Sequence, residues 1–286
     1  MTEEKRATAP GLYLVGTPIG NLEDITMRAL RVLKQVDVIA CEDTRQTQKL
    51  LNHYAIATRT TSYHEHNELT RSEELVDLMR KGASVALVTD AGMPGVSDPG
   101  YRLITLAIRH SLPIIPVPGA SAFLTALAAS GLPTDSFRFN GFLPAKQGER
   151  RATVELLRTS SDTEIFYEAP HRVLDTLGDI AELLGPDRQM VLARELTKMH
   201  EEFLRGTVSK ILSILRSRDA VKGEITLLIG KGEPLKAQQE PVVSVRHRVA
   251  QIMAEDQVDE KSALKKIAKE RGVSKSEIYR EMQRER

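Results

Sequence analysis

Short apolar runs alternate with amphipathic stretches from residue 11 to residue 230, and this alternation constrains the fold more than any other feature of the sequence. Apolar runs of four or five residues are typical of buried strands, whereas apolar residues spaced by three or four indicate helices that pack on a sheet. Met27, Leu30 and Leu33 have the helical spacing, and another helix is expected over 101–109. Five strands are expected in this first series, at 12–15, 36–40, 60–63, 85–88 and 114–117. The pattern predicts an α/β fold.

A second series of the same kind follows an apolar helix expected over 120–130 and the turn Gly131-Leu132-Pro133. Its strands are expected at 137–142, 165–167, 190–193 and 225–229. Its helices are expected at 152–158, 173–184 and 208–215. Some of the connections are short enough for hairpins, which indicates a mixed sheet.

These patterns predict three parts: an N-terminal α/β domain (11–131), a second α/β domain (132–232) and a C-terminal helical unit (242–286). Residues 230–241 read as a polar linker. In the last part, apolar pairs on both sides of Gly272-Val273-Ser274 have helix-turn-helix spacing, and the serine is expected to cap the second helix. Such a helix pair is either a packing hairpin or a nucleic-acid contact. In the second case, the side chains placed to meet phosphates are Arg271, Lys275, Arg280 and Arg284.

Charge and cysteine content restrict the class of protein further. The 286 residues hold 40 Lys and Arg against 39 Asp and Glu, a net charge of +1, which argues against a polybasic arm. Residues 246–286 nevertheless carry 11 basic and 8 acidic residues, or +3. The single cysteine, Cys41, excludes an internal disulfide and fits a reducing compartment. No apolar run reaches the ~18 residues of a membrane span, and the polar N-terminus lacks a signal-peptide core. We expect a cytoplasmic protein that does not contact membranes.

Loops rich in glycine, proline and small polar residues follow the expected strands, at the strand ends where open α/β sheets bind ligands. The loop 16–21 (GTPIGN) is not the G-x-G-x-x-G fingerprint, and Pro18 removes one amide donor. A dinucleotide-binding dehydrogenase and the ordinary class of methyltransferase are therefore disfavoured. In the loop 89–100, Asp90 is placed to bind ligand hydroxyls or amines, and Asp98 is expected to cap the next helix. With the small residues of 118–122, these loops predict a cleft for a nucleoside-like cofactor.

Two further loops carry titratable side chains. The second strand ends in Cys41-Glu42-Asp43-Thr44-Arg45, which is either a helix N-cap box with a neutralising arginine or a polar group that binds a hydroxyl-bearing substrate and takes its proton. The third strand leads to His64 and His66. No third ligand follows this His-x-His at a recognisable spacing, so we expect no metal site.

Nine segments carry a family resemblance: 15–22 (VGTPIGNL), 42–45 (EDTR), 89–94 (TDAGMP), 98–101 (DPGY), 118–122 (PGASA), 141–144 (GFLP), 166–172 (FYEAPHR), 193–198 (ARELTK) and 222–224 (KGE). On these segments, in this order, the chain resembles the ribosomal RNA small-subunit methyltransferase I family, and the C-terminal helical unit is similar too. Met93 and Ala169 are single-residue departures inside the motifs.

The resemblance implies the tetrapyrrole-methylase fold, two α/β domains with the cofactor in the cleft between them, usually as a homodimer. It implies S-adenosylmethionine as methyl donor and 2′-O-methylation of a cytidine ribose in the decoding region of small-subunit (16S) rRNA, as naked RNA or in the 30S subunit. The residues that the motifs assign to the cofactor cleft are Pro18, Asp90, Ala91, Gly92, Val96, Ser121, Ala122, Phe142, Leu143, Tyr167, Glu195 and Glu224.

A ribose hydroxyl is a weak nucleophile, so its attack requires a proton acceptor. We predict that Glu42, Asp43, Arg45 and His64 form the catalytic group. Glu42 or His64 is then the base, and Arg45 either holds a phosphate or fixes the carboxylates.

Three positive charges follow the strand expected at 137–142. We predict that Lys146, Arg150 and Arg151 contact RNA phosphates from a loop. Two alternatives stay open: a small-molecule methylase of the same fold, and a ligand-sensing DNA-binding regulator. The basic loop and the helical tail argue against the first alternative, because a small substrate needs neither.

Overall fold

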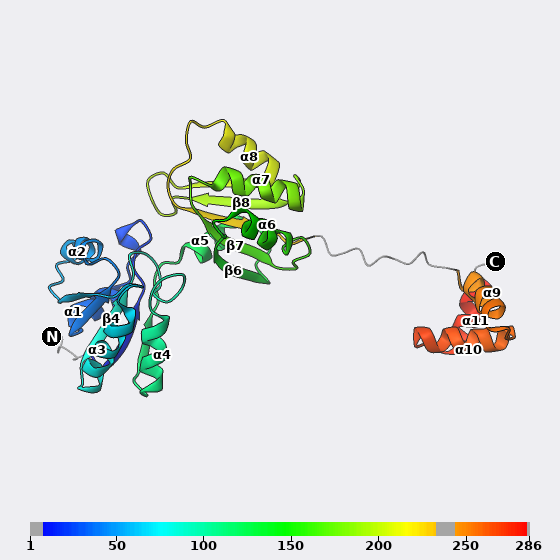
Figure 1. The fold of residues 1–286 in the computed structure, drawn as a ribbon, viewed down its shortest axis with the longest axis horizontal. Helices are drawn as coiled ribbons and strands as arrows, with labels where there is room; N and C mark the ends of the chain where they lie inside the picture. Colours follow the sequence, from blue (N-terminus) through cyan, green and yellow to red (C-terminus); the bar gives the residue numbers. More distant parts are fainter. Residues whose placement is uncertain (1–7, 233–243, 285–286) are drawn as a thin grey trace. The chain divides into compact units, whose positions relative to one another are not determined.

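The structure, a computed structural model, describes residues 8–232 and 244–284 (Figure 1). The chain separates into two compact units, residues 1–232 and 233–286. Most of the predicted linker 230–241 lies outside the described residues. The first unit contains two five-stranded sheets, and the second contains three helices.

The first sheet is parallel throughout, with its strands in the order β3-β2-β4-β1-β5. These strands are β1 (Gly11–Val15), β2 (Val38–Cys41), β3 (Thr60–Ser62), β4 (Ser84–Val88) and β5 (Ile114–Val117). The helices between them are α1 (Met27–Gln35), α2 (Thr44–His53), α3 (Glu68–Arg80) and α4 (Tyr101–Arg109), and a short 3-10 helix, η1 (Leu22–Asp24), precedes α1. All five strands occur close to their predicted positions, although β3 (TTS) contains no apolar residue.

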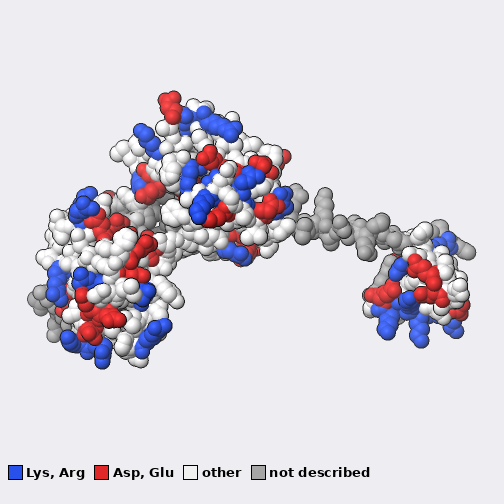
Figure 2. Space-filling model, viewed as in Figure 1, with Lys and Arg blue, Asp and Glu red and all other residues white. Residues whose placement is uncertain are grey.

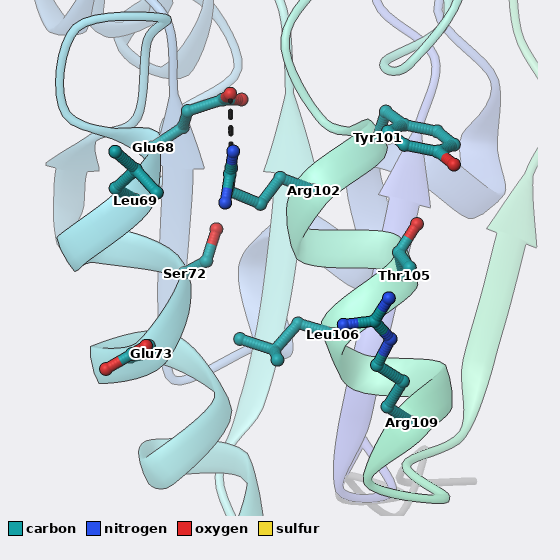
Figure 3. Close-up of a pocket in the computed structure, with 9 residues that line it drawn as sticks. All are labelled: Glu68, Leu69, Ser72, Glu73, Tyr101, Arg102, Thr105, Leu106 and Arg109. Carbon is teal, nitrogen blue, oxygen red and sulfur yellow. Dashed lines mark hydrogen bonds and ion pairs between the residues drawn. The ribbon is translucent and has the colours of Figure 1, made fainter.

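Alternate residues of each strand face two helical layers. In β2, Ile39 packs with Leu33 of α1 and Leu51 of α2, whereas Ala40 packs with Leu75 of α3 and Leu103 of α4. Residues on both faces are buried, which explains why the strands read as continuous apolar runs. Lys and Arg are intermixed with Asp and Glu over the visible surface of this unit (Figure 2). Helices α3 and α4 lie side by side and are bridged by Arg102 and Glu68 at 3.4 Å (Figure 3).

The second sheet is mixed, as the short connections predict, with its strands in the order β6-β7-β10-β8-β9. Only β6 and β7 pair in parallel. The strands are β6 (Phe137–Phe142), β7 (Thr163–Glu168), β8 (Gln189–Arg194), β9 (Glu202–Thr207) and β10 (Ile225–Ile229). The helices of this part are α5 (Ala122–Ser130), α6 (Gln147–Glu155), α7 (Val173–Leu184) and α8 (Val208–Arg216).

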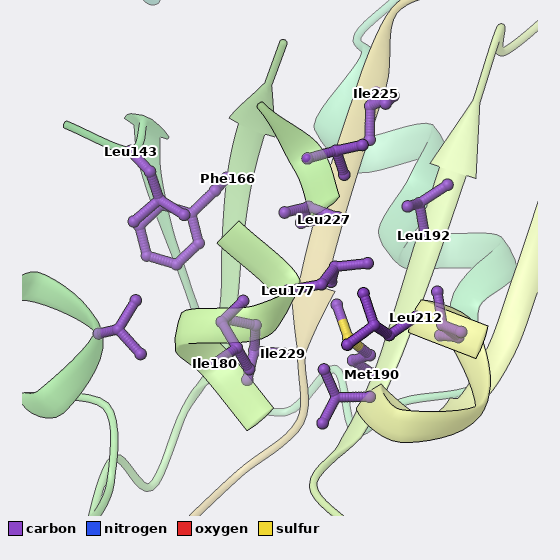
Figure 4. Packing of buried hydrophobic residues seen from close by; sticks show 14 of the residues in the cluster. Leu143, Phe166, Leu177, Ile180, Met190, Leu192, Leu212, Ile225, Leu227 and Ile229 are labelled. Carbon is purple, nitrogen blue, oxygen red and sulfur yellow. The ribbon is translucent and has the colours of Figure 1, made fainter. Parts of the chain in front are cut away.

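The two faces of this sheet also have different partners. Leu227 of β10 packs toward Leu177 of α7 and Leu212 of α8 (Figure 4). Its neighbour Leu228 packs on the other face with Leu127 of α5 and with Ile19, from the loop after β1. By packing, α5 therefore belongs with the second sheet, whereas the boundary predicted at residue 131 groups it with the first.

Two expectations about local structure are wrong. The helix expected over 152–158 begins at Gln147, so the basic segment that precedes it is helical and not a loop. Strand β9 is missed because its sequence, EFLRGT, lacks an apolar run. Backbone pairing with β8 along six residues defines this strand, although its side chains show no strand pattern.

The C-terminal unit contains α9 (Val245–Asp256), α10 (Glu260–Arg271) and α11 (Lys275–Arg284) around its own buried core. The predicted helix pair is α10 and α11. Gly272 ends α10 in the left-handed region (φ 68°), and Ser274 and Glu277 form a reciprocal capping box that begins α11. None of the described helices is both long and apolar enough to span a bilayer.

Because this small unit has a separate core, it should be destabilised without loss of the first unit. Ile278, which is fully buried, closes that core. Ile278→Ala should cost about 2–5 kcal/mol, enough to unfold a unit of this size. Hydrogen exchange should show lost amide protection across 244–284 and unchanged protection across 8–232. Val273→Ala, at a 42% exposed side chain, is the control and should retain protection in both units.

Candidate functional site

The parallel order of the first sheet brings the carboxyl ends of all five strands to one edge. Strand β4 lies between β1 and β2, and β3 follows β2 at the sheet margin. Residues that directly follow these strands are therefore neighbours although they are far apart in sequence. The amide of Asp43, after β2, donates a hydrogen bond to Oδ1 of Asp90, after β4, at 3.3 Å.

Three carboxylates at this edge have raised pKa values. Burial raises the pKa of Glu42, and the charges of Asp90 and Glu65 raise it further, while His64 and the Asp90 amide lower it. Burial and the Asp43 charge raise the pKa of Asp90. Burial, Glu42 and Asp90 together raise the pKa of Asp98 to about 6. Mutual repulsion and partial loss of water thus make these groups better proton acceptors than ordinary carboxylates.

Asp98 does not have the helix-capping role expected from the sequence. The residue that precedes α4 is Gly100, and it provides no side-chain cap. The φ of Ser97 is +61° and that of Gly100 is +145°. This backbone path leaves the carboxylate of Asp98 close enough to Glu42 and Asp90 for their charges to raise its pKa. A long loop that changes direction at these residues gives no sequence signal for such a position.

Asp43 and Arg45 satisfy one another. The Asp43 carboxylate caps α2 by accepting the Arg45 amide at 2.8 Å, and it accepts two further hydrogen bonds from the Arg45 guanidinium. These bonds lower the pKa of Asp43 to about 2, so this carboxylate is a weak base. Of the two roles predicted for Arg45, the structure favours fixing a carboxylate. The structure therefore shows the helix cap of the first interpretation at Asp43, and the substrate-binding role of the second stays a prediction that rests on Glu42.

His64 lies beside Glu42 and is held by Asn67. The Asn67 amide side chain contacts Nε2 at 3.3 Å, and its oxygen accepts the His64 backbone amide at 2.9 Å. Nδ1 is buried and has no hydrogen-bond partner among the described residues. His66 packs edge-on to this ring at 5.9 Å between centroids. Within the described ranges, no three His, Cys, Asp or Glu side chains gather in an arrangement that could hold a metal ion.

The loops after β1, β4 and β5 make a backbone cradle. Thr17 and Gly92 exchange two backbone hydrogen bonds, and the Thr17 hydroxyl donates to the Thr89 carbonyl at 3.0 Å. Gly16 and Gly119 touch so closely that a Cβ on Gly119 would lie 2.8 Å from Cα of Gly16. An alanine at either position would force these two loops apart.

This cradle fits a nucleoside-type cofactor. Gly92 (φ +82°) leaves a space in which an added Cβ would come no closer than 3.8 Å to its nearest neighbours. Ser121 precedes α5 without a side-chain cap, so first-turn amides other than that of Phe123, which bonds to Tyr167, stay available as donors. Asp90 offers a carboxylate for hydroxyls or an amine. The remaining residues that the motifs assign here are Pro18, Ser121 and Ala122, which are half-buried, and Ala91 and Val96, which are exposed.

A row of aromatic rings joins α5 to strands β6 and β7 of the second sheet. Phe123 stacks on Phe139 at 4.3 Å, and the ring of Tyr167 contacts both Phe139 and Phe142. Burial raises the pKa of Tyr167 to about 12, although its oxygen accepts the Phe123 amide at the start of α5; Asp98 and Glu224 add smaller effects. Phe142 is 59% exposed and available to a ligand.

Other residues predicted for the second half of the cleft are already engaged. The Leu143 side chain is buried in the core, so only its backbone can face a ligand. Glu195 accepts hydrogen bonds from Lys198 (2.8 Å) and from the Glu224 amide (2.9 Å). The Glu224 side chain is 76% exposed and pairs with Lys198 at 3.2 Å. Sequence reasoning did not single out Lys198, since a lysine in a loop gives no signal of its partners.

The prediction that Arg150 contacts RNA is wrong. Its side chain is 5% exposed and donates to Asp179 of α7 at 2.7 Å. The partly exposed Arg151 pairs with both Asp179 and Glu182. The ion pairs of Arg150 and Arg151 therefore join α6 to α7. Because the segment is helical, Arg150 lies on the buried face of α6. Lys146 remains 82% exposed, paired only with Glu149 at 3.1 Å, and its contact with RNA stays a prediction.

Two hollows in the first unit lie apart from the carboxylate group. One, of about 410 Å³, lies between α3 and α4 and is lined by residues that include Tyr101, Thr105 and Arg109 (Figure 3). The other, of about 450 Å³, lies along α2 and includes Arg45 and Lys49. Neither contains Glu42, His64 or Asp90.

The fold and this edge of the sheet define a methylase of the tetrapyrrole type: residues 11–212 match the family described as Tetrapyrrole (Corrin/Porphyrin) Methylases. Among solved structures, uroporphyrin-III-C-methyltransferase from Thermus thermophilus superposes with a TM-score of 0.55 at 24% identity, covering 78% of this chain and 94% of that one. The cobalamin biosynthetic enzyme cobalt precorrin-4 methyltransferase has a TM-score of 0.56 at 20% identity, with 77% and 94% covered.

Within the tetrapyrrole-type methylases, the relatives most similar in sequence to this chain include rRNA methyltransferases. The ribosomal RNA small subunit methyltransferase I of Halalkalibacterium halodurans is 50% identical over 275 residues, 94% of this chain and 93% of the relative. The protein of the same name from Bacillus subtilis is 42% identical over 272 residues, 94% and 92%. The chain belongs to the ribosomal RNA small subunit methyltransferase I family. Its methyl donor is S-adenosylmethionine, which tetrapyrrole methylases use.

The raised pKa of Asp98 predicts a pH-dependent stability. The folded protein binds a proton at Asp98 up to about pH 6, whereas the unfolded chain releases it near the ordinary aspartate pKa of 3.8. The free energy of unfolding therefore falls as pH rises from about 4 to 6. Asp98→Asn should remove this pH-dependent loss of stability and be more stable than the parent by about 1 kcal/mol at pH 8. This difference is smaller than the pKa shift alone would give, because Asp98 is partly exposed to water.

Urea unfolding at pH 4, 6 and 8 measures this difference. Parent and Asp98→Asn should have similar stability at pH 4 and diverge by pH 8. Asp219→Asn, at an exposed carboxylate, should follow the parent throughout. A constant offset between Asp98→Asn and the parent at all three pH values would contradict the prediction.

Proposed function

We propose that this protein transfers a methyl group from S-adenosylmethionine to small-subunit rRNA, at the ribose 2′-hydroxyl of a cytidine in the decoding region. The proposal includes 16S rRNA or the 30S subunit as partner, a homodimeric enzyme and a cytoplasmic location, where that substrate is assembled. It extends to this chain the activity that the relatives' names state, and it adds the position of the methyl group.

The observation that carries the proposal is the extent of the likeness to the rRNA methyltransferases. Only 243 residues precede Ser244, so an alignment over 94% of the chain extends into the C-terminal unit. The uroporphyrin-III-C-methyltransferase is matched over nearly its whole length by 78% of this chain. The alignment with the rRNA methyltransferase thus includes the C-terminal unit, whereas the uroporphyrin-III-C-methyltransferase, which has the same fold, is matched almost completely by the rest of the chain. This supports RNA over a tetrapyrrole as substrate.

The first-sheet edge supports the chemistry. S-adenosylmethionine, when bound, supplies a methyl group on a positively charged sulfur, so the electrophile needs no activation by the protein. The chain must instead orient a ribose hydroxyl and accept its proton. The Glu42 carboxylate combines a raised pKa with partial burial. His64, whose buried Nδ1 lacks a partner, lies close enough to influence that carboxylate.

We assign the proton acceptor to Glu42 rather than to Asp43. Asp43 is neutralised by Arg45 and fixed at the start of α2. Glu42 has no such guanidinium partner in the part of the chain that the structure describes, and its pKa moves toward the physiological range, where a general base is most effective. Arg45 then acts through Asp43, by holding the turn from which Glu42 projects.

Mapping of 2′-O-methyl groups tests the proposed reaction. Small-subunit rRNA from cells with and without this protein should differ at one cytidine of the decoding region. Purified protein with S-adenosylmethionine should restore that mark on 30S subunits from the deficient cells. An unchanged 2′-O-methyl pattern would contradict the position on the ribose, and a mark on a base instead would redefine the reaction. Light scattering of the purified protein measures its oligomeric state, and a monomer would contradict the homodimer.

Glu42→Gln should lower kcat by about 10²–10⁴, because the amide keeps the shape of the side chain and accepts no proton. The Kd for S-adenosylmethionine, measured by calorimetry, should stay within about twofold of the parent value. Glu65→Gln changes the same functional group at an exposed position nearby and should reduce kcat only slightly. Full turnover in Glu42→Gln would remove the base assignment and leave the methyltransferase assignment intact.

A further inference from the structure

Lysines occupy the solvent face of α10. Lys261, Lys265 and Lys269 are exposed and recur every four residues, so they form one stripe along the helix. The opposite face is apolar and buried in the core of the unit, through Leu264 and Ile267. The eight residue steps from Lys261 to Lys269 make about two turns of helix and place the outer two lysines about 12 Å apart along the axis. Figure 2 shows Lys and Arg gathered along one side of this unit, with Asp and Glu on an adjacent side.

Among the described residues, the stripe lysines form no ion pairs, unlike other cations of the same unit. Lys266 pairs with Asp256 at 2.5 Å, and Arg248 reaches Glu270 at 3.7 Å. No carboxylate of the described ranges lies within ion-pair distance of the three stripe lysines, although Lys261 contributes to lowering the pKa of Asp259. Their charge is therefore not paired within the described part of the unit. It is available to an external anion.

The stripe differs from the surface that the sequence pattern predicted. A helix-turn-helix interpretation assigned phosphate contacts to the turn and to α11, through residues such as Lys275 and Arg280. Glu277 and Glu281 lie on α11 among those cations, whereas the exposed face of α10 is basic along 261–269 without an acid. The denser uncompensated charge is thus on α10.

We propose that the α10 stripe of Lys261, Lys265 and Lys269 binds the phosphate backbone of the RNA substrate. The inference rests on the proposed function and names the surface by which the C-terminal unit contributes to it. Lysines act as point charges that contact phosphates without reading bases, so the stripe adds affinity and orientation and leaves the choice of nucleotide to the first unit. Double-helical RNA suits this surface, because Tyr279 is the one large aromatic exposed among residues 244–284 and no stacking platform is present there.

The same residues fit a membrane poorly. A helix that lies in a lipid interface needs an exposed apolar face, and the apolar face of α10 is buried against α9 and α11. The exposed positions 261, 262, 265, 266, 269 and 270 are all polar or charged. Bare charge without apolar contact matches a nucleic-acid backbone better than a lipid surface.

The test replaces the three lysines together in the full chain, as Lys261→Gln, Lys265→Gln and Lys269→Gln. Filter binding to 30S subunits over a range of KCl should show affinity about tenfold or more weaker at low salt, with the slope of log K against log [salt] reduced by roughly 2–3. The KM for 30S subunits should rise while kcat and the Kd for S-adenosylmethionine stay at parent values. Hydrogen exchange across 244–284 should match the parent, because all three side chains are exposed.

The matched control removes three exposed lysines of the first unit, as Lys34→Gln, Lys81→Gln and Lys210→Gln, with the same change of net charge. It should change the affinity and the salt slope by much less than the stripe variant. Equal effects of the two triple variants, or an unchanged slope in the stripe variant, would overturn the proposal. So would unchanged 30S binding accompanied by lost binding to phosphatidylserine vesicles.

This outcome is separable from that of the proposed function. If the parent protein leaves no 2′-O-methyl mark but the stripe variant still binds 30S subunits more weakly than the parent, the proposed reaction is contradicted and the proposed RNA-binding surface is supported. A parent that methylates normally, with a stripe variant that binds and methylates equally well, would contradict the surface alone.

Discussion

The parallel pairing of β2, β4 and β1 is the constraint on which the candidate site depends. Parallel strands end together, so the residues after β2 and β4 are forced into contact, and the Asp43 amide meets the Asp90 carboxylate at 3.3 Å. The pairing also places the β1 loop beside the β4 loop, where Thr17 and Gly92 bond to each other. If β2 and β4 were not neighbours, the carboxylates at this edge would be separate surface groups with ordinary pKa values.

Crowding of like charges is the physical consequence of that pairing. Glu42, Asp90 and Asp98 repel one another where water is partly excluded, and the fold tolerates the cost. Elsewhere the same chain neutralises its acids: Arg150 and Arg151 satisfy Asp179, and Arg218 and Arg194 lower the pKa of Glu202 to about 2. Three neighbouring carboxylates with raised pKa values at one edge of one sheet contrast with these paired acids, and strongly perturbed groups of this kind cluster at functional sites.

The second sheet and the C-terminal unit extend the site in different ways. The second sheet closes on the β-strand loops through α5 and Ile19, and it brings the aromatic row of Phe139, Tyr167 and Phe142 to the same side. The C-terminal unit has its own core and capping box, so its helices need no support from the methylase fold. In the proposed function, the loops of the first sheet hold the cofactor and the separately packed C-terminal unit holds the RNA, so the two tasks of an RNA-modifying enzyme fall to different parts of the chain.

The sequence by itself determined the class of fold, the positions of the first-sheet strands and the family, because buried strands require continuous apolar runs and the loop motifs are distinctive. It also predicted that Glu42 and His64 lie together, since polar groups at strand ends have few packing uses, and their role in catalysis stays a prediction. Only the tertiary structure decided the state of each charge: Asp43 is a cap, Asp98 is a crowded acid and Arg150 is buried against Asp179. Local sequence fixes which residues are polar, whereas pKa and availability depend on neighbours that are distant in the chain and that only packing brings together.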